Sequence, residues 1–255
     1  MLSVKNISVD IQGMRILHGI SFSARKCEAL ALLGPNGCGK STLIKSILGL
    51  CDMTSGNIFF EGRDISLYSR KERALMFAYM PQNTASLSLF TVLETVVMGR
   101  YPHLGRLFGN YSKRDFEIAR DAIERIGLSG FEDRPVSSLS GGEAAMVMLA
   151  RSLAQDTPVI LLDEPTSSLD PGHALAIADV IKKLAASGKS LIVSMHDVNM
   201  ALNHSDRLIL LKNGHIFGNM PSEEADRNVL EGLYGISWDI WRTPKGHVAA
   251  IPDRE

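Results

Sequence analysis

A glycine-rich segment carries the first residues whose types and spacing suit chemistry. It fits the pattern G-x-x-x-x-G-K-[ST] and consists of Gly34, Pro35, Asn36, Gly37, Cys38, Gly39, Lys40 and Ser41. Glycines in such a loop let backbone N–H groups point at phosphate, and the start of a following helix adds positive potential. Lys40 can then reach the β- and γ-phosphates, and the Ser41 hydroxyl can bind Mg²⁺. A purely structural turn would need neither side chain, so the segment predicts a nucleotide-phosphate site.

Two neighbouring carboxylates follow an apolar run later in the chain. Val159 to Leu162 read as a buried strand, and Asp163 and Glu164 come directly after it. In a parallel sheet, ligands bind at the carboxyl ends of the strands, which is where the phosphate loop also begins. Asp163 would then bind Mg²⁺ and Glu164 would polarise an attacking water. The alternative is a pair of acids that caps a helix.

A histidine and a serine-glycine turn are further candidates. His196 follows the apolar run Leu191 to Met195, a position where a lone histidine is more often structural. Ser140, Gly141 and Gly142 precede a helical segment, and Ser140 with Glu143 has the spacing of a capping box, which is a purely local explanation. The two glycines can equally expose N–H groups to an anion, so the nucleotide of a partner chain is the other explanation.

Cys38 is the one thiol inside the phosphate loop. Oriented N–H groups and the nearby Lys40 should lower the pKa of this thiol and favour a reactive thiolate. The alternative is a small, tolerated side chain without a role in catalysis.

The elements that must position these residues follow from periodicity. Strands are expected over Ser3–Asp10, Leu17–Ser23 and Glu28–Leu33, and a helix over Ser41–Leu50 with Gly49 as its stop. Residues 84–155 have helical patterns, with capped starts at Thr91 and Ser112, an interruption at Tyr101–Gly105 and an end at Gly127. Further segments then alternate between strand and helix: strands over Val159–Leu162, Leu191–Met195 and Leu208–Leu211, and a helix over Ala174–Ala186.

This alternation predicts an α/β fold with a mostly parallel sheet, an antiparallel N-terminal β part and an inserted helical subdomain. We expect one domain over 1–255. In it, residues 1–83 and 156–222 form the nucleotide-binding core, 84–155 the helical subdomain and 223–255 a small C-terminal appendage.

Composition and charge exclude several classes of function. A net charge of −1 gives no electrostatic footprint for nucleic acid. The longest apolar runs fall far short of the roughly 20 residues needed to cross a bilayer, and the N-terminus has no signal-peptide pattern. Three cysteines without a C-x-x-C pair argue against both a disulfide framework and a zinc site.

The motifs together resemble the ATP-binding subunits of ABC transporters, across nearly the whole chain, with the P-loop NTPase core of that family. In chain order, Gly34 to Thr42 is similar to the Walker A loop, Gln82 to the Q-loop, Leu139 to Glu143 to the signature, Asp163 and Glu164 to the Walker B end, Ser167 to Asp170 to the D-loop, and His196 to the switch histidine.

The resemblance implies ATP and Mg²⁺ as cofactors and assigns roles to residues. Nucleotide-binding positions would be Gly34, Pro35, Asn36, Gly37, Cys38, Gly39, Lys40, Ser41 and Thr42, and, in the signature and D-loop, Ser140, Gly141, Gly142 and Asp170. Mg²⁺ would be held by Ser41, Gln82 and Asp163, and catalysis would use Glu164, His196, Gln82 and Lys40.

The resemblance also implies partners and a location. Two copies would form a head-to-tail dimer with each ATP between one chain's Walker A loop and the other chain's signature. The helical subdomain would take the coupling helix of one of two transmembrane permease subunits, with an extracytoplasmic solute-binding protein as an indirect partner. The chain would then lie at the cytoplasmic face of the membrane.

Some segments of the sequence indicate which subtype of ABC transporter the chain resembles. The segments Thr91–Glu94, Met98–His103, Asp133–Pro135 and Leu233–Ile236 are similar to importers of iron-siderophores, haem and cobalamin, and metal or oxyanion importers share them. The motifs also leave open an exporter subunit or a nontransport ABC ATPase. Ile11 stands where the family usually has an aromatic residue stacked on adenine, which leaves open whether Ile11 or a neighbour such as Arg15 contacts the base.

Overall fold

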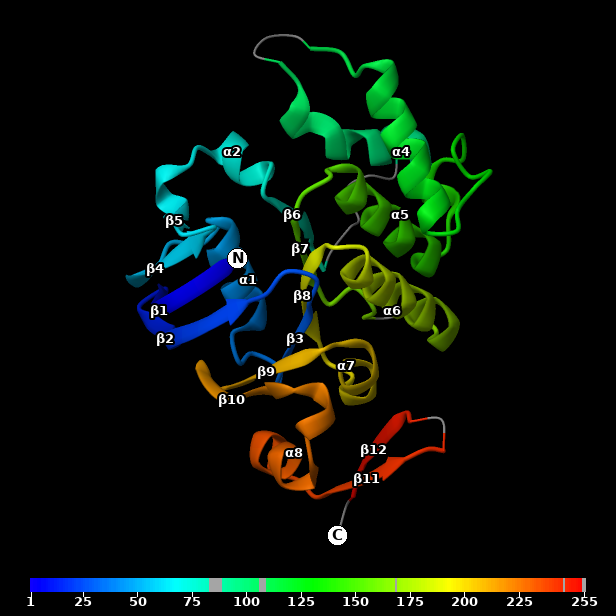
Figure 1. Cartoon of the computed structure of the whole chain (residues 1–255). Helices are drawn as coiled ribbons and strands as arrows, with labels where there is room; N and C mark the ends of the chain where they lie inside the picture. Colours follow the sequence, from blue (N-terminus) through cyan, green and yellow to red (C-terminus); the bar gives the residue numbers. More distant parts are fainter. Residues whose placement is uncertain (83–88, 106–108, 168, 245, 254–255) are drawn as a thin grey trace. The chain divides into compact units, whose positions relative to one another are not determined.

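The computed structural model describes residues 1–82, 89–105, 109–167, 169–244 and 246–253 (Figure 1). The chain divides into two compact units. The first unit comprises residues 1–67 and 184–255, and the second comprises residues 68–183.

An antiparallel sheet opens the first unit. Its strands are ordered β2-β1-β4-β5, and their bounds are β1 Leu2–Ile11, β2 Met14–Ala24, β4 Ser55–Phe60 and β5 Arg63–Asp64, after which a short 3₁₀ helix covers Ile65–Leu67. Leu2 pairs with Ala24 on one side and with Phe60 on the other. The expected antiparallel N-terminal part is therefore confirmed.

The first unit also holds a set of strands that flank β3. The strand β3 (Ala29–Leu33) runs parallel to β8 (Ser190–Met195) and to β9 (Arg207–Lys212), and β10 (His215–Pro221) pairs antiparallel with β9. All residues of β3 and β8 are buried. This burial explains why β3 is a continuous apolar run, and why β8 is apolar apart from Ser190 and Ser194, instead of alternating. Helix α1 (Lys40–Leu48) follows β3 and ends at Gly49, as predicted.

The C-terminal part of the first unit contains α7 (Val198–His204), a 3₁₀ turn (Ser222–Glu224), α8 (Arg227–Tyr234) and a hairpin of β11 (Trp238–Arg242) and β12 (Val248–Pro252). Two asparagines of α7 hold the hairpin. The Asn199 side chain accepts from the Ala250 N–H (2.6 Å) and donates to the Ala250 carbonyl (3.0 Å). Asn203 makes the same pair of bonds with Val248, at 2.8 and 2.7 Å.

The second unit combines two parallel strands with helices. Its elements are α2 (Arg70–Ala74), β6 (Phe77–Met80), α3 (Val92–Val97), a 3₁₀ helix (Met98–His103), α4 (Lys113–Arg125), a 3₁₀ turn (Val136–Ser138), α5 (Gly141–Ala154), β7 (Val159–Asp163) and most of α6 (Pro171–Ala186). Helices α3, α4 and α5 pack against one another (Figure 1). The capped helix starts at Thr91 and Ser112 are confirmed, each with a reciprocal capping box.

The α/β fold class, with its antiparallel N-terminal sheet, mainly parallel strands and helical region, is confirmed. Where an interruption was expected after α3, the chain forms a 3₁₀ helix that contains Pro102. Proline has no N–H for an α-helical bond, which accounts for the change of helix type. None of the helices in the described parts of the chain is long and apolar enough to cross a membrane.

Candidate nucleotide site

The loop between β3 and α1 has the backbone of a phosphate cradle. A Cβ atom on Gly34 would lie 2.1 Å from the Leu211 carbonyl oxygen, so only glycine fits there. Gly39 is the N-cap of α1, has a φ of 106°, and no side chain caps the helix start. The first N–H groups of a helix have no partner within the helix, so this start can receive an anion.

Lys40 lies over this loop. Its side chain is almost fully buried, and its Nζ donates to the carbonyl oxygens of Gly34 (2.7 Å) and Pro35 (3.2 Å). No acidic residue occurs in the first turn of α1, so the local charge is positive. Ser41 and Thr42 follow Lys40 on the same turn and are half-buried, whereas Asn36 and Gly37 are exposed. The cradle fits a phosphate group.

His196 lies beside the loop. In the parallel pairing of β3 with β8, Leu33 is opposite Met195, so Gly34 and His196 leave the two strands at the same register. His196 is exposed, and the following residue, Asp197, caps α7 through the Met200 N–H (3.1 Å). Of the predicted residues, the first unit thus brings the phosphate loop and His196 together.

Cys38 differs from the expectation. Its side chain is only 5% exposed. Burial raises the pKa of the Cys38 thiol, and the opposing effects of Lys40 and of nearby backbone N–H groups are smaller. The prediction of a lowered pKa was therefore wrong, because desolvation disfavours the thiolate more than the neighbouring positive potential favours it.

A labelling experiment checks this correction. Maleimide should modify the exposed Cys27 well before the buried Cys38 in the folded, nucleotide-free protein, because the reagent needs an accessible thiolate. Peptide mass mapping over a time course measures both rates. In denaturant the two cysteines should react alike, which is the control. Equal rates in the folded protein would contradict the buried, protonated thiol.

The second unit places three predicted residues at the ends of β6 and β7. Met80 pairs with Leu162, so the chain beyond β6 runs beside Asp163 and Glu164. The Gln82 Nε2 atom donates to Glu164 Oε2 at 2.5 Å. Asp163 is buried, whereas Glu164 is partly exposed and has a φ of 52°. A left-handed conformation is costly for a side chain of this type and recurs at functional sites.

Tyr79 completes this cluster. Its hydroxyl hydrogen-bonds Asp163, and burial together with the negative charge of Asp163 raises the pKa of Tyr79 to about 12. The hydroxyl is therefore protonated near neutral pH and donates to the carboxylate. Sequence reasoning missed Tyr79, which lies three residues before Gln82 on the strand paired with β7.

The described residues contain no group of three or more histidine, cysteine, aspartate or glutamate side chains that could hold a metal ion by themselves. Mg²⁺ is usually bound in proteins through one or two carboxylates together with substrate phosphates and water. Within the second unit, the buried Asp163 and the Gln82 amide, which contacts the neighbouring Glu164, offer oxygen donors of the kind that such a site needs.

The serine-glycine turn forms the capping box that its spacing predicted. The Ser140 Oγ accepts from the Glu143 N–H (3.2 Å), and Glu143 Oε2 accepts from the Ser140 N–H (2.7 Å). Gly142 contacts the ring of His173, and His173 bonds to Asp170. The second unit thus brings the predicted residues Gly142 and Asp170 together through His173, which the sequence analysis missed. Ser168, in the same predicted loop as Asp170, lies outside the described residues.

Ile11 and Arg15, the two candidates for a contact with the base, lie at the turn of β1 and β2. Ile11 is 40% exposed. The Arg15 guanidinium is engaged by Asp10, with Nε 2.7 Å from Oδ1.

Comparisons with known proteins find similarity to ABC transporters and their ATP-binding proteins. A family model described as ABC transporter matches residues 17–167. The Hemin import ATP-binding protein HmuV of Streptomyces coelicolor is 38% identical over 97% of this chain and 88% of its own length.

Two solved structures are also similar. One, described as a metal-chelate type ABC transporter in an inward-facing conformation, has a TM-score of 0.87 and 26% identity, covering 100% of this chain and 98% of that one. The other is an ATP-binding cassette in dimeric form, bound to ADP and phosphate after hydrolysis. It has a TM-score of 0.76 and 26% identity, and covers 87% of this chain and 99% of that one.

Proposed function

The chain belongs to the ABC transporter family, and from this premise we propose that it is the ATP-hydrolysing subunit of an importer for metal-chelate solutes. The observation that carries the proposal is the contact of Gln82 with Glu164 at the end of β7, next to the buried Asp163. The Gln82 amide holds the partly exposed carboxylate of Glu164, whose backbone has a strained left-handed conformation. This arrangement suits a carboxylate that must orient water.

In the proposed reaction, the N–H groups of the phosphate loop and Lys40 hold the β- and γ-phosphates of ATP. Ser41, Gln82 and Asp163 would hold Mg²⁺, and the bound ion would supply positive charge that stabilises the phosphate oxygens. Glu164, with His196, orients a water molecule and accepts its proton while the water oxygen bonds to the γ-phosphorus. The bond from this phosphorus to the β-phosphate oxygen breaks, which yields ADP and phosphate.

Hydrolysis requires two copies in this proposal. Ser140, Gly141 and Gly142 of one chain would contact the γ-phosphate of ATP held by the other, and Asp170 would lie near the same nucleotide. The N–H groups of Gly141 and Gly142 lie at the start of α5, where backbone donors have no partner within the helix, and this supports a contact with phosphate. The dimeric relative bound to ADP and phosphate supports the paired arrangement.

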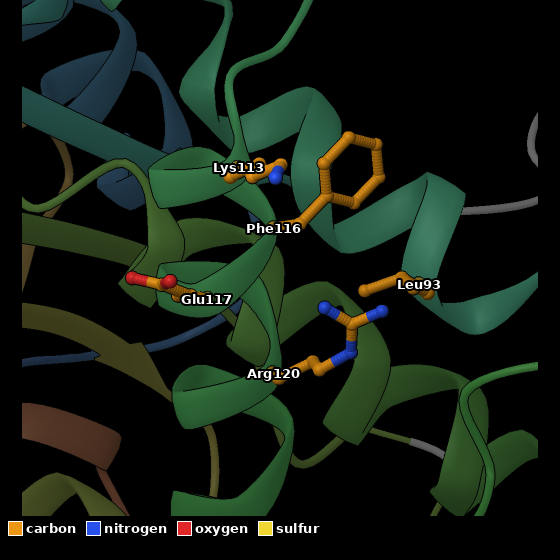
Figure 2. Close-up of a pocket in the computed structure, with 5 residues that line it drawn as sticks. All are labelled: Leu93, Lys113, Phe116, Glu117 and Arg120. Atoms are coloured by element: carbon orange, nitrogen blue, oxygen red, sulfur yellow. The ribbon is translucent and has the colours of Figure 1, made fainter.

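A pocket in the helical subdomain, which we place at residues 84–155, is the proposed contact for a permease. It has a volume of about 440 Å³ and is lined by Leu93 of α3 and by Lys113, Phe116, Glu117 and Arg120 of α4. Figure 2 shows Phe116 and Arg120 on the side of α4 toward Leu93, with Glu117 directed away. Apolar side chains flanked by two cations suit a short amphipathic segment that carries an acidic residue.

The solute class rests on the relatives. The hemin import protein and the metal-chelate type transporter both cover nearly the whole chain. We therefore propose uptake of a metal chelate, with hemin as the first solute to test, at the cytoplasmic face of the membrane beneath separate permease subunits.

The test is reconstitution. The chain is coexpressed with the permease subunits encoded beside its gene, and the complex is placed in proteoliposomes with ATP on the side of this chain. Hemin uptake that depends on MgATP and on the solute-binding protein would support the proposal. Extrusion of solute, or uptake of an oxyanion or free metal in place of any chelate, would contradict the proposed solute class.

The permease contact gives a separate prediction. Arg120→Glu should reduce copurification of the permease at least roughly tenfold, because charge reversal opposes an acidic partner segment and a close charge pair at an interface contributes about 1.5 kcal/mol or more. Arg125→Glu is the matched control, since Arg125 ends the same helix and pairs with Asp121 instead of lining the pocket. Equal copurification of the permease with both variants would show that this pocket is not part of the interface.

A further inference from the structure

His173 lies in the first turn of α6 and covers one residue of the serine-glycine turn. A Cβ atom on Gly142 would lie 2.3 Å from the His173 Cγ, 2.5 Å from Cδ2 and 2.7 Å from Nδ1. These ring atoms therefore occupy the space that a side chain at position 142 would need. Gly141 differs, because a Cβ atom there would meet nothing within 4 Å.

Asp170 fixes the orientation of this ring. Its Oδ2 lies 2.5 Å from His173 Nδ1, and its Oδ1 accepts from the N–H groups of Gly172 (2.9 Å) and His173 (3.2 Å). The hydrogen bond from His173 is the main cause of the lowered pKa of Asp170. Both side chains are well exposed, at 60% for Asp170 and 37% for His173. A contact between two exposed polar side chains adds little stability, so this one sets the direction of the ring more than it strengthens the fold.

The first turn of α5 is held from two sides. The capping box of Ser140 engages the Glu143 N–H, and the His173 ring lies against Gly142. The N–H groups of Gly141 and Gly142 belong to the helix start, where backbone donors have no partner within the helix. A small rotation of this turn would redirect both donors.

We propose that His173 is a positioning residue for ATP hydrolysis. Asp170 orients the imidazole ring, the ring fixes Gly142, and the fixed turn presents its N–H groups to the γ-phosphate held by the second copy. The inference rests on the proposed function, in which this turn meets the partner's nucleotide. His173 itself touches neither the phosphate nor the attacking water in this assignment.

A kinetic comparison tests the role in the full-length protein. His173→Ala should lower kcat roughly tenfold, the effect of losing about 1.4 kcal/mol of transition-state stabilisation. ATP binding by the monomer, measured by fluorescent-nucleotide titration, should change less than about twofold, because the phosphate loop is not altered. His173→Asn places an N–H near the position of Nδ1 and should recover part of the lost kcat. A His173→Ala variant with the kcat of the unmodified protein would overturn the role.

A thermal cycle tests the contact without nucleotide. Gly142→Ala should lower Tm by roughly 2–4 °C, the shift expected for a loss of about 1 kcal/mol in a chain of this size. In the His173→Ala background the same substitution should no longer lower Tm, because the collision is gone. Gly141→Ala is the matched reference and should not lower Tm in either background. A Gly142→Ala effect that is independent of His173 would overturn the contact.

The two tests separate this inference from the proposed function. If Glu164→Gln protein with His173 intact forms no dimer with MgATP, the nucleotide sandwich fails, whatever the thermal cycle shows. If that dimer forms and His173→Ala leaves both kcat and dimer formation unchanged, the positioning role fails while the proposed function stands.

Discussion

Replacing Glu164 with glutamine is expected to abolish most ATP turnover, by roughly 100-fold or more, while ATP binding persists. An amide cannot accept the proton of an attacking water, and the loss of a general base costs about 10²- to 10⁴-fold in rate. The amide oxygen can still accept the hydrogen bond from Gln82, which is 2.5 Å long in the unmodified protein. Glutamine also occupies the left-handed conformation of Glu164, with a φ of 52°, at the same steric cost as glutamate.

Trapped ATP should then hold two copies together. Size-exclusion chromatography with MgATP should show a dimer of the Glu164→Gln variant, and a phosphate-release assay should show the loss of turnover. Glu124→Gln, the same change on an exposed position of α4, is the control and should hydrolyse ATP normally. A monomer in MgATP together with near-normal hydrolysis would refute the role of Glu164.

Lys40→Ala should weaken ATP binding roughly 10- to 100-fold. The variant loses an ammonium group that is placed over the loop by bonds to the Gly34 and Pro35 carbonyls. Hydrogen bonds to charged groups contribute about 1.5–3 kcal/mol each, and about 1.4 kcal/mol corresponds to a tenfold change in affinity. Titration with a fluorescent ATP analogue measures the change.

Lys45→Ala provides the comparison for this variant. Lys45 lies on the same helix, carries the same charge and is exposed. Its removal should alter the affinity for ATP by less than about twofold, because a solvated charge interacts weakly with a distant anion. If both variants bind ATP equally well, the lysine of the loop does not hold phosphate.

The sequence predicts the parts of the candidate site whose chemistry is local. The phosphate loop needs glycines, a lysine and a hydroxyl in one short segment between a buried strand and a helix. All of these can be read directly from the amino-acid sequence. The pair Asp163 and Glu164 was equally visible, because the apolar run before it could only be buried. Gln82 became a candidate only through resemblance, since its contact with Glu164 spans 82 positions of sequence.

Other features depend on packing between segments that are far apart in the sequence, which no short stretch of sequence reveals. The four-residue strand β6 carries too little periodicity to be recognised, yet it places Tyr79 against Asp163. The pKa of Cys38 was predicted in the wrong direction because the positive potential of the loop can be inferred from neighbours in sequence, whereas the burial of one side chain within a glycine-rich loop cannot. His173 escaped notice because its partner Gly142 lies on another helix and has no side chain to suggest a contact.

The attachment of the C-terminal hairpin has a consequence for which of its residues can be substituted. Residues four apart on a helix are separated by about 6 Å along its axis, close to the span of about 6.7 Å between alternate residues of a strand. Asn199 and Asn203 use this match, and their side-chain amides make four hydrogen bonds to main-chain groups of β12. Substitutions at the exposed positions of β12, Ile251 and Pro252, should therefore leave the attachment intact, whereas loss of either asparagine should weaken it.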